Sequence, residues 1–580
     1  MLRLSVPALL VALAVTSPTR AAETPDPLRC IPASSQVVVK VENPRKLAEA
    51  VVALDALKAA QGIPQARAVL DSTTARRLLQ MLAYVEQELG AKWPELLDQL
   101  AGGGIALGAP LGDNNPPVLV AIQGRDEKQV AKAFDLLIRV ADEELTRLGA
   151  KERPVRGKLL DHDTVRLGEF QAARVGAAVL VSNNDDALKA GVILAANHKP
   201  DAPPAGLLAK KSVQDARKLL PKDPLAWLWV DLSTLKESQA AKDFFASTRD
   251  DLFQTLLGGT TIDCVRRSDF VAAGLYQEKT GFRLAVRLPA GRSEFPPEFA
   301  LHVPPKGEPG SLPLLEPPGV IYSQSFYLDI GYLWKNRDKL INEQTRKQIE
   351  EGEQQLSKIL PGSVKLGELL EAWGPYHRIV VVNQEKLPYK TEPGVRLPGF
   401  AYVARMGDPK FGTGLESIIR SGGVVASLQY NLKMVEETHD GVKVVGWRFS
   451  ETKPIPEDSQ NLRFNYEPCF CTVGDEFVFA SSFEVARKII TEIRRTAQMP
   501  GNPAVWQGKL YADGAADLLF SFSDPLITET ILGEGVGLDE ARQQIKDIAA
   551  YVRKLGTIRV EIDERDAEYR LDVVWEYKTK

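Results

Sequence analysis

Two cysteines, Cys469 and Cys471, lie two residues apart in a segment whose pattern predicts a β-strand. Side chains at i and i+2 of a strand point to the same face, so both thiols should face the same way. Structural zinc needs four ligands, and no histidine lies near this pair in the sequence. We therefore expect two small core residues and no metal site. In an oxidising compartment either could pair with Cys30 or Cys264, and the sequence does not decide the connectivity.

The densest cluster of histidine and carboxylates is Asp161-His162-Asp163. A carboxylate beside a histidine can orient it as a general base. Adjacent residues of an extended chain point apart, however, and no nucleophile is evident, so we expect a solvated loop. The remaining histidines are scattered and carry no pattern: His198, His302, His377 and His439.

A glycine-rich stretch at 101–108 invites a phosphate-binding interpretation. A dinucleotide loop must follow a strand and open a helix, because the helix N-terminus holds the phosphate. Here a helical pattern (93–100) precedes the glycines and a strand pattern follows them. We expect a helix end that leads into a strand, and a plain loop at Gly533, Gly535 and Gly537. Catalytic and ligand-binding residues therefore stay unknown, and we expect no metal and no cofactor.

Trp227 and Trp229 alternate along a predicted strand, which places both indoles on one face. Such a pair can form a stacking platform for a sugar or another flat ligand. The segment 518–524 has aromatic residues at a similar spacing and is taken as the counterpart of this strand later in the chain. A shared aromatic spacing favours a role in the core for both tryptophans.

The composition is that of an ordinary globular protein. The chain has 580 residues, 44% of them hydrophobic and 26% charged, with a net charge of -4. There is no global basic field to hold nucleic acid, so no nucleic-acid partner is expected. Four cysteines argue against a disulfide scaffold.

The first 22 residues have the layout of a secretory signal. A basic start at Arg3 is followed by an apolar run (4–15) and a stretch of small residues that ends at Ala21-Ala22. The run is too short for a spanning helix, which needs ~20 apolar residues. We predict cleavage after residue 22, an exported periplasmic or extracellular protein, and no transmembrane helix in the mature chain. An uncleaved anchor is the alternative. Cys30 lies well past the apolar run, which argues against lipid attachment there.

Similar patterns recur in the two halves of the chain. Residues 173–181 and 471–479 both read as strand, glycine turn and strand before a helix, and each position lies 298 residues after its counterpart. Ser481 and Glu484 have the spacing of a capping box at the second of these helices. Two further matches, at 118–126 with 400–408 and at 270–288 with 558–575, occur in the same order. This indicates an internal duplication.

The proposed boundaries follow from these matches and from a run of prolines. Eight prolines fall within 296–318, which favours extended structure over helix or central strand. We predict a signal peptide (1–22), a first module (23–295), a proline-rich linker (296–318) and a second module (319–580). Helices are expected after Asn43, with Pro44 in the first turn, and from Leu78 to a stop at Gly90. Tight turns and alternating polarity predict mostly antiparallel strands, so we expect an α+β fold in which each module packs an extended sheet on helices.

These elements also carry a family resemblance. The early strand 36–41 after Pro32-Ala33, and the glycine-turn strands that end in serine before 187–189 and 485–488, resemble uncharacterised exported bacterial proteins of the domain-of-unknown-function 3352 type. The resemblance covers most of the mature chain. It implies no established activity and no catalytic residues.

Three functions remain open from the sequence. The failure of catalytic motifs, the export signal and the repeated module favour a non-catalytic exported protein that binds a partner or ligand in the cell envelope. A carrier of lipid or another hydrophobic ligand is an alternative, with a curved sheet and helices around an apolar cavity. A hydrolase with a dispersed carboxylate pair is a further alternative.

Overall fold

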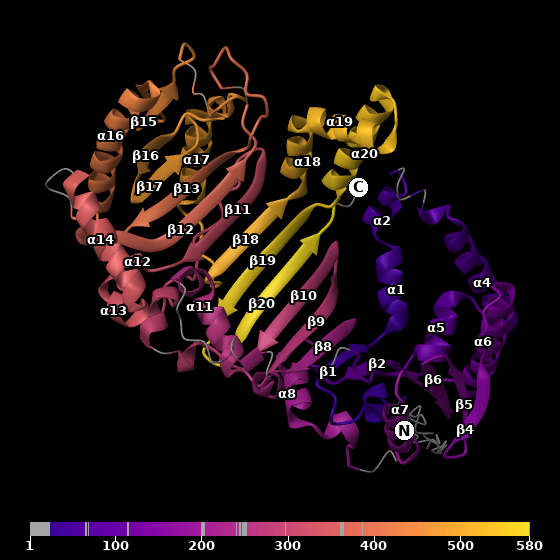
Figure 1. Cartoon of the computed structure of the whole chain (residues 1–580). Helices are drawn as coiled ribbons and strands as arrows, with labels where there is room; N and C mark the ends of the chain where they lie inside the picture. Colours follow the sequence, from indigo (N-terminus) through magenta and orange to yellow (C-terminus); the bar gives the residue numbers. More distant parts are fainter. Residues whose placement is uncertain are drawn as a thin grey trace, which may run out of the picture.

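The structure is a computed structural model that describes residues 24–63, 67, 69–112, 115–198, 203–238, 241–242, 245, 252–295, 297–359, 365–385, 387–453, 455 and 457–578. The predicted signal peptide lies outside these residues. Helices and antiparallel strands alternate along the chain (Figure 1), so the α+β prediction is confirmed.

Twenty strands of the described residues belong to one sheet. Ten come from the first half: β1 (Val37–Val41), β2 (Gly104–Ala109), β3 (Leu119–Gln123), β4 (Val155–Leu159), β5 (His162–Leu167), β6 (Phe170–Val175), β7 (Ala178–Ser182), β8 (Ala226–Asp231), β9 (Phe270–Glu278) and β10 (Gly281–Leu288). Ten come from the second: β11 (Val320–Tyr327), β12 (Trp373–Val382), β13 (Gly399–Met406), β14 (Leu432–His439), β15 (Val442–Phe449), β16 (Cys469–Val473), β17 (Glu476–Ala480), β18 (Trp506–Tyr511), β19 (Thr557–Glu564) and β20 (Tyr569–Glu576).

The two halves have the same strand order. The pairings run β4-β5-β6-β7-β3-β2-β1-β8-β9-β10 in the first half and β14-β15-β16-β17-β13-β12-β11-β18-β19-β20 in the second. The last strands of the halves, β10 and β20, pair with each other over their full length, with Ala285 opposite Asp572. The halves therefore share one continuous sheet, and its curved centre is visible in Figure 1.

Helices lie at the strand ends and on both faces of the sheet. Those of the first half are α1 (Pro44–Val52), α2 (Asp55–Ala60), α4 (Thr73–Leu89), α5 (Trp93–Ala101), α6 (Glu127–Arg147), α7 (Asp185–Ala196), α8 (Lys211–Leu219), α9 (Leu232–Glu237) and α11 (Leu252–Arg267). Those of the second half are α12 (Ile330–Lys335), α13 (Arg337–Leu340), α14 (Glu343–Ile359), α15 (Leu366–Glu371), α16 (Lys410–Tyr430), α17 (Phe483–Thr496), α18 (Ala512–Ser521), α19 (Ser523–Glu534) and α20 (Leu538–Lys554).

Local sequence signals explain where several helices begin and end. The Asn43 side chain accepts from the Lys46 amide at the start of α1, as predicted. Gly90 adopts φ 75° and ends α4, also as predicted. The capping prediction at α17 was wrong by one residue, because Ser482 accepts from the Val485 amide. The Ser481 hydroxyl instead accepts from the Phe400 amide of β13.

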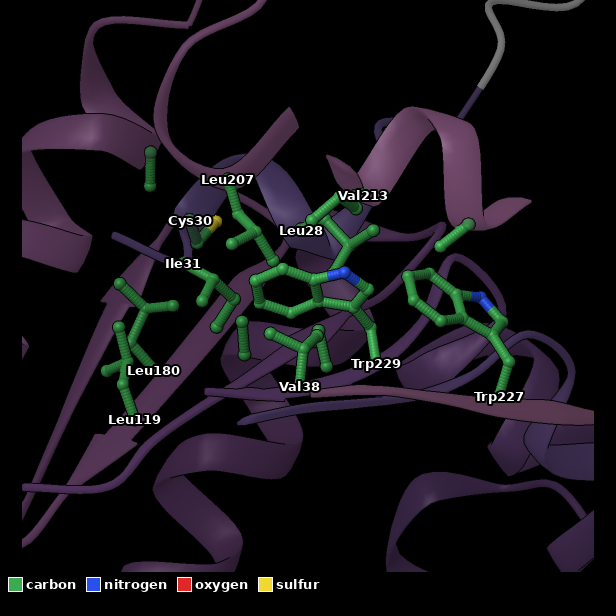
Figure 2. Packing of buried hydrophobic residues seen from close by; sticks show 14 of the residues in the cluster. Leu28, Cys30, Ile31, Val38, Leu119, Leu180, Leu207, Val213, Trp227 and Trp229 are labelled. Carbon is green, nitrogen blue, oxygen red and sulfur yellow. The ribbon is translucent and has the colours of Figure 1, made fainter. Parts of the chain in front are cut away.

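The core of the first half lies on one face of the sheet. Trp229 is fully buried, and its indole packs beside Val38, Leu207 and Val213 (Figure 2). These neighbours come from β1, from a short 3-10 helix (Gly206–Ala209) and from α8. Trp227 lies on the same face and is also buried, so the two tryptophans act as core residues.

The core of the second half is built around α17. Its side chains Val485, Ile489 and Ile493 pack on the inner residues of β12, β13, β16 and β17. The assigned counterpart of the Trp227 strand was wrong, because 518–524 lies in α18 and α19. The strand at the matching place in the sheet is β18, which pairs with β11 as β8 pairs with β1.

The proline-rich stretch lies against the second half. Leu301 and Leu315 are fully buried, and the buried Ser311 hydroxyl donates to the Ala504 carbonyl. The described part of the stretch contains a 3-10 helix at 297–302 and one isolated bridge, from Ser311 to Asn502. Its prolines keep it out of the ladder, and its apolar side chains nevertheless contribute to the core.

Candidate functional site

Strands β10, β20 and β19, at the centre of the sheet, have one apolar face and one face that carries charged side chains. Side chains of a strand alternate between the two faces. On β10, Phe282, Leu284 and Val286 point to one face, and Arg283 and Arg287 point to the other. We name the first of these the open apolar face.

Cross-strand pairing extends one row of this face over eight strands without a charged side chain. Leu284 lies opposite Leu275 on one side and Val573 on the other. The row continues in both directions through register partners, and it comprises Val41, Ala226, Leu275, Leu284, Val573, Val560, Gly508 and Gln324. The neighbouring row on one side comprises Phe282, Trp575, Ile558, Leu510 and Tyr322.

This face is partly open to solvent in its middle. Exposed fractions are 37% for Val39, 40% for Leu284, 40% for Ile558 and 42% for Leu510, which lie on four different strands. Most of their neighbours in the rows are half-buried. Contiguous apolar surface of this kind marks a ligand or partner site more often than a scattered exposed leucine does.

The opposite face of the same strands carries paired charges. Arg287 donates to both carboxylate oxygens of Asp572 at 3.1 Å. Arg559 donates to Glu561 at 3.3 Å, and Lys509 donates to Glu316 at 3.0 Å. The apolar face, by contrast, gains free energy when it is covered.

Helices α9 and α11 cover one end of the open apolar face. Leu232 and Cys264 pack with Leu288 and Tyr569, and the half-buried residues of the same cluster include Val230, Val271, Ile562 and Leu571. Figure 1 shows α11 at one end of the central strands and α18 with α20 at the other. The middle of the face, around Leu284, remains the part that a ligand can reach.

Glu564 ends β19 at the covered edge of this face and is 3% exposed. One of its carboxylate oxygens, Oε2, has no hydrogen-bond partner. Burial raises the pKa of this carboxyl to about 7, with a hydrogen bond from Thr260 and the charge of Arg292 opposing the shift. A neutral acid therefore lies beneath α11 at mildly acidic pH.

The predicted chemical motifs are not brought together. Asp161 lies in the turn between β4 and β5, and Asp163 pairs with Arg174 across the hairpin. The glycine-rich stretch joins the end of α5 to β2, as predicted. Gly535, with φ 69°, ends α19.

The four cysteines are free and buried. Cys469 and Cys471 share β16, as predicted, and both belong to the core beneath α17. Cys30 and Cys264 belong to two other clusters. Burial raises the pKa of Cys471 to about 12 and that of Cys469 well above its usual value, so neither is a reactive thiolate. Among the described residues, no three His, Cys, Asp or Glu side chains are grouped to hold a metal ion.

A buried ion pair that no sequence pattern indicated joins β12 and β17. Arg378 is 2% exposed and donates to Glu476, beside a pocket of about 510 Å³ that Arg405 also lines. Burial lowers the pKa of Arg378 and raises that of Glu476, so each charge depends on the other. These residues lie 98 positions apart, and only the pairing of β12, β13 and β17 brings them together.

His377, which has no pattern around it in the sequence, is buried in the structure. Its ring stacks on Phe326 at 5.1 Å between centroids. Its Nε2 lies 2.8 Å from the Leu328 carbonyl, and its Nδ1 lies 2.7 Å from the Tyr402 hydroxyl. The carbonyl can only accept, so Nε2 carries the proton and Nδ1 accepts from Tyr402. Burial lowers the pKa of His377 to about 4, so the ring is neutral at ordinary pH.

Comparisons with solved structures find a distant likeness. No family model and no curated protein matches the chain. Crystal forms III and I of the treponemal protein TP0453 match with TM-scores of 0.25 and 0.23 at 7% and 8% identity. They cover 48% and 47% of this chain and 84% and 82% of TP0453. At these TM-scores the likeness carries no argument about fold or function. In the part of the chain that the structure describes, no helix is long and apolar enough to cross a bilayer.

Proposed function

We propose that this chain is a non-catalytic binding protein that holds an apolar ligand, such as a lipid acyl chain, on the open apolar face. The observation that carries the proposal is the partly exposed row centred on Leu284 and Val573. Apart from Gly508 and Gln324, its side chains are aliphatic, and they offer dispersion contacts and the hydrophobic effect without charge.

The interior position of this face favours a small apolar ligand over an added polypeptide strand. The strands beneath Leu284 are paired on both sides, so their amides and carbonyls are already used in the ladder. An extended peptide that recognises a sheet binds at a free edge through those groups. An acyl chain needs no hydrogen bonds and can lie across the rows.

Substitutions at the centre of the face test the proposal. We expect Leu284→Glu to weaken binding of dansyl-labelled undecanoic acid by about tenfold or more, because a carboxylate then lies beside the ligand. Val574→Glu is the matched control, since Val574 follows Val573 on β20 and points to the charged face. Equal binding by the wild-type chain and Leu284→Glu, or equal losses in both variants, would refute the proposal.

We also propose that the chain is exported and that its two halves arose by duplication. A signal peptide at 1–22 would deliver the chain to the periplasm or the medium, where lipids and other amphiphiles are available. The identical strand order of the halves supports an origin by duplication. Peptide mass mapping of the secreted protein would test the predicted cleavage after residue 22.

A further inference from the structure

Strand β14 forms one edge of the sheet. It pairs with β15 on one side, and no strand of the described residues pairs with its other side. Its hairpin turn consists of Asp440 and Gly441, with φ 48° and 76°, and His439 lies opposite Val442 beside the turn. A two-residue turn of this kind is flanked by a hydrogen-bonded pair, so every second residue of β14 points its amide and carbonyl away from β15. The residues with outward backbone groups are Leu432, Met434, Glu436 and Thr438.

The free edge of β14 is accessible to solvent. Met434 is 51% exposed, and the residues Lys433, Glu436 and Thr438 are exposed as well. The strand is eight residues long and contains neither proline nor glycine. Outward amides and carbonyls on such an edge can pair with a further strand, and β14 has none of the proline or bulge features that prevent this pairing.

The opposite edge of the sheet, β4, is protected against pairing with a copy of itself. It is five residues long and has Gly157 at its centre. Its turn is also of the two-residue kind, so the residues with outward backbone groups are Arg156 and Lys158. In a symmetric pair centred on Gly157 these two basic side chains would lie opposite each other. Like charges in that position destabilise a strand pair.

Strand β14, by contrast, is complementary to a copy of itself. Two antiparallel strands place residues with outward backbone groups opposite each other. The symmetric register centred on Val435 meets this condition and sets Lys433 opposite Glu437 on both sides of the centre. Lys433 lies opposite Arg448 on its own hairpin and makes no ion pair among the described residues, so a second copy supplies the missing carboxylate. A register centred on Glu436 would instead set two glutamates opposite each other.

We propose that two copies of this chain pair through their β14 strands, antiparallel and centred on Val435, so that their sheets join end to end. Glu437 accepts from Arg448 and Arg487 at 3.0 Å each, and its carboxylate has lone pairs left for Lys433 of the second copy. A symmetric contact of this kind closes after two copies and leaves β4 free. The contact is separate from the ligand site proposed above and does not depend on it.

Sedimentation velocity of the full chain tests for the dimer. We expect the wild-type chain to form a reversible dimer at micromolar concentrations. Met434→Pro removes one outward amide without touching the pairing of β14 with β15, and it should raise the dissociation constant of the dimer by about tenfold or more. Lys433→Glu sets like charges opposite each other and should weaken the dimer by a similar factor. Lys158→Pro is the matched control, because it removes an outward amide at the β4 edge and should dimerise as the wild-type chain does.

Disulfide trapping tests the register. The four native cysteines are buried, so a new thiol at the edge can be oxidised selectively. Val435→Cys should give a disulfide-linked dimer, because residue 435 faces itself in a pair without hydrogen bonds, where the two Cα atoms approach most closely. Met434→Cys faces Glu436 in the same register and should stay unlinked.

Four results would overturn the proposal. The first is a wild-type chain that stays monomeric throughout the micromolar range, and the second is a Met434→Pro variant that dimerises as the wild-type chain does. The third is equal crosslinking of Val435→Cys and Met434→Cys. The fourth is loss of assembly in Lys158→Pro as well as in Met434→Pro, because β14 then pairs with β4 of the next copy in an open chain.

Discussion

The two halves carry different side chains at corresponding positions where β7 pairs with β3 and where β17 pairs with β13. In the first half Ala178 begins β7 and faces Gln123, and in the second Glu476 begins β17 and faces Arg405. The matching core position on the next strand is Ala106 in β2 and Arg378 in β12, which face Ala121 and Val403. Thus one backbone arrangement holds an apolar pair in one half and a buried ion pair in the other.

The first half also contains a buried arginine near this position, but it comes from another element. Arg29 lies in the 3-10 helix at Pro27–Cys30 and donates to Gln123 at 2.8 Å and to the Ala195 carbonyl at 3.1 Å. The shared strand order therefore does not require the Arg378–Glu476 pair. It is a local feature of the second half and can be replaced.

The largest effect should come from breaking this pair on one side only. Arg378→Met leaves the Glu476 carboxylate buried and unpaired, so it should cost about 3–5 kcal/mol of the free energy of unfolding. The double substitution Arg378→Met and Glu476→Leu imitates the apolar first half and should recover most of that loss. Urea unfolding of the three proteins measures both effects. A double variant as unstable as the single one would mean that the second half needs the ion pair.

A second difference between the halves concerns an ionisable residue, Glu564. Gln277 on β9 and Glu564 on β19 occupy corresponding positions in the two halves. Each lies two residues after the residue that pairs with the first residue of the neighbouring strand, which is β8 for Gln277 and β18 for Glu564. The folded chain raises the pKa of Glu564 from 4.5 to about 7 and so binds a proton that the unfolded chain releases earlier. Stability should therefore fall as pH rises from 4.5 to 7, by about 3 kcal/mol.

Glu564→Gln places the first-half residue type at this position and should remove that pH dependence. We expect it to stabilise the chain at pH 8 and to have little effect at pH 4, as thermal unfolding across this range can measure. A wild-type pH profile that coincides with that of the variant would show that Glu564 is not the titrating group.

His377 provides a third contrast, because Ile105 occupies the corresponding place on β2 of the first half. The folded chain lowers the pKa of His377 from 6.5 to about 4, so the unfolded chain binds the proton first as pH falls. Stability should therefore be lost between pH 6.5 and 4, by about 3 kcal/mol. His377→Ile should be less stable at pH 7, because Tyr402 loses a partner, yet its stability should change less over this range. Parallel profiles for the two proteins would contradict this assignment.

The smallest effects should appear where the halves agree. Asn184 caps α7 and Ser482 caps α17, each through a side-chain oxygen that accepts from the amide three residues on. Asn184→Ala and Ser482→Ala should each cost about 1 kcal/mol. Ser481→Ala, one residue earlier, tests whether Ser482 alone caps α17. Hydrogen exchange of the amides in the first turn of α17 should be the same in this variant as in the wild-type chain. Fraying of α17 in Ser481→Ala would restore the original capping prediction.

Local features of the fold could be predicted from the sequence, because their signals lie within a few residues. The glycine turns at Gly176 and Gly474, with φ 59° and 61°, and the hairpin β9–β10 were predicted correctly. The segment 518–524 was misassigned because alternating aromatics also occur in a helix that buries only part of its surface.

The candidate surface could not be predicted in this way. Alternation at Leu284 and Val286 identifies an apolar face but does not say whether helices cover it. The pairing of Leu284 with Val573 joins positions nearly 300 residues apart, and no local pattern encodes it. A separation of 98 positions hid the Arg378–Glu476 pair in the same way.

Photolabelling can locate a bound apolar ligand on the sheet. The full chain is irradiated with a diazirine-labelled long-chain fatty acid, and the labelled peptides are identified by mass spectrometry. We expect labels on β10, β19 and β20, at residues of the open apolar face such as Leu284, Ile558 and Val573. Unlabelled fatty acid should compete for them, and Leu284→Glu should reduce them strongly. Competed labels confined to other elements, with β10, β19 and β20 unmodified, would show that the ligand binds elsewhere.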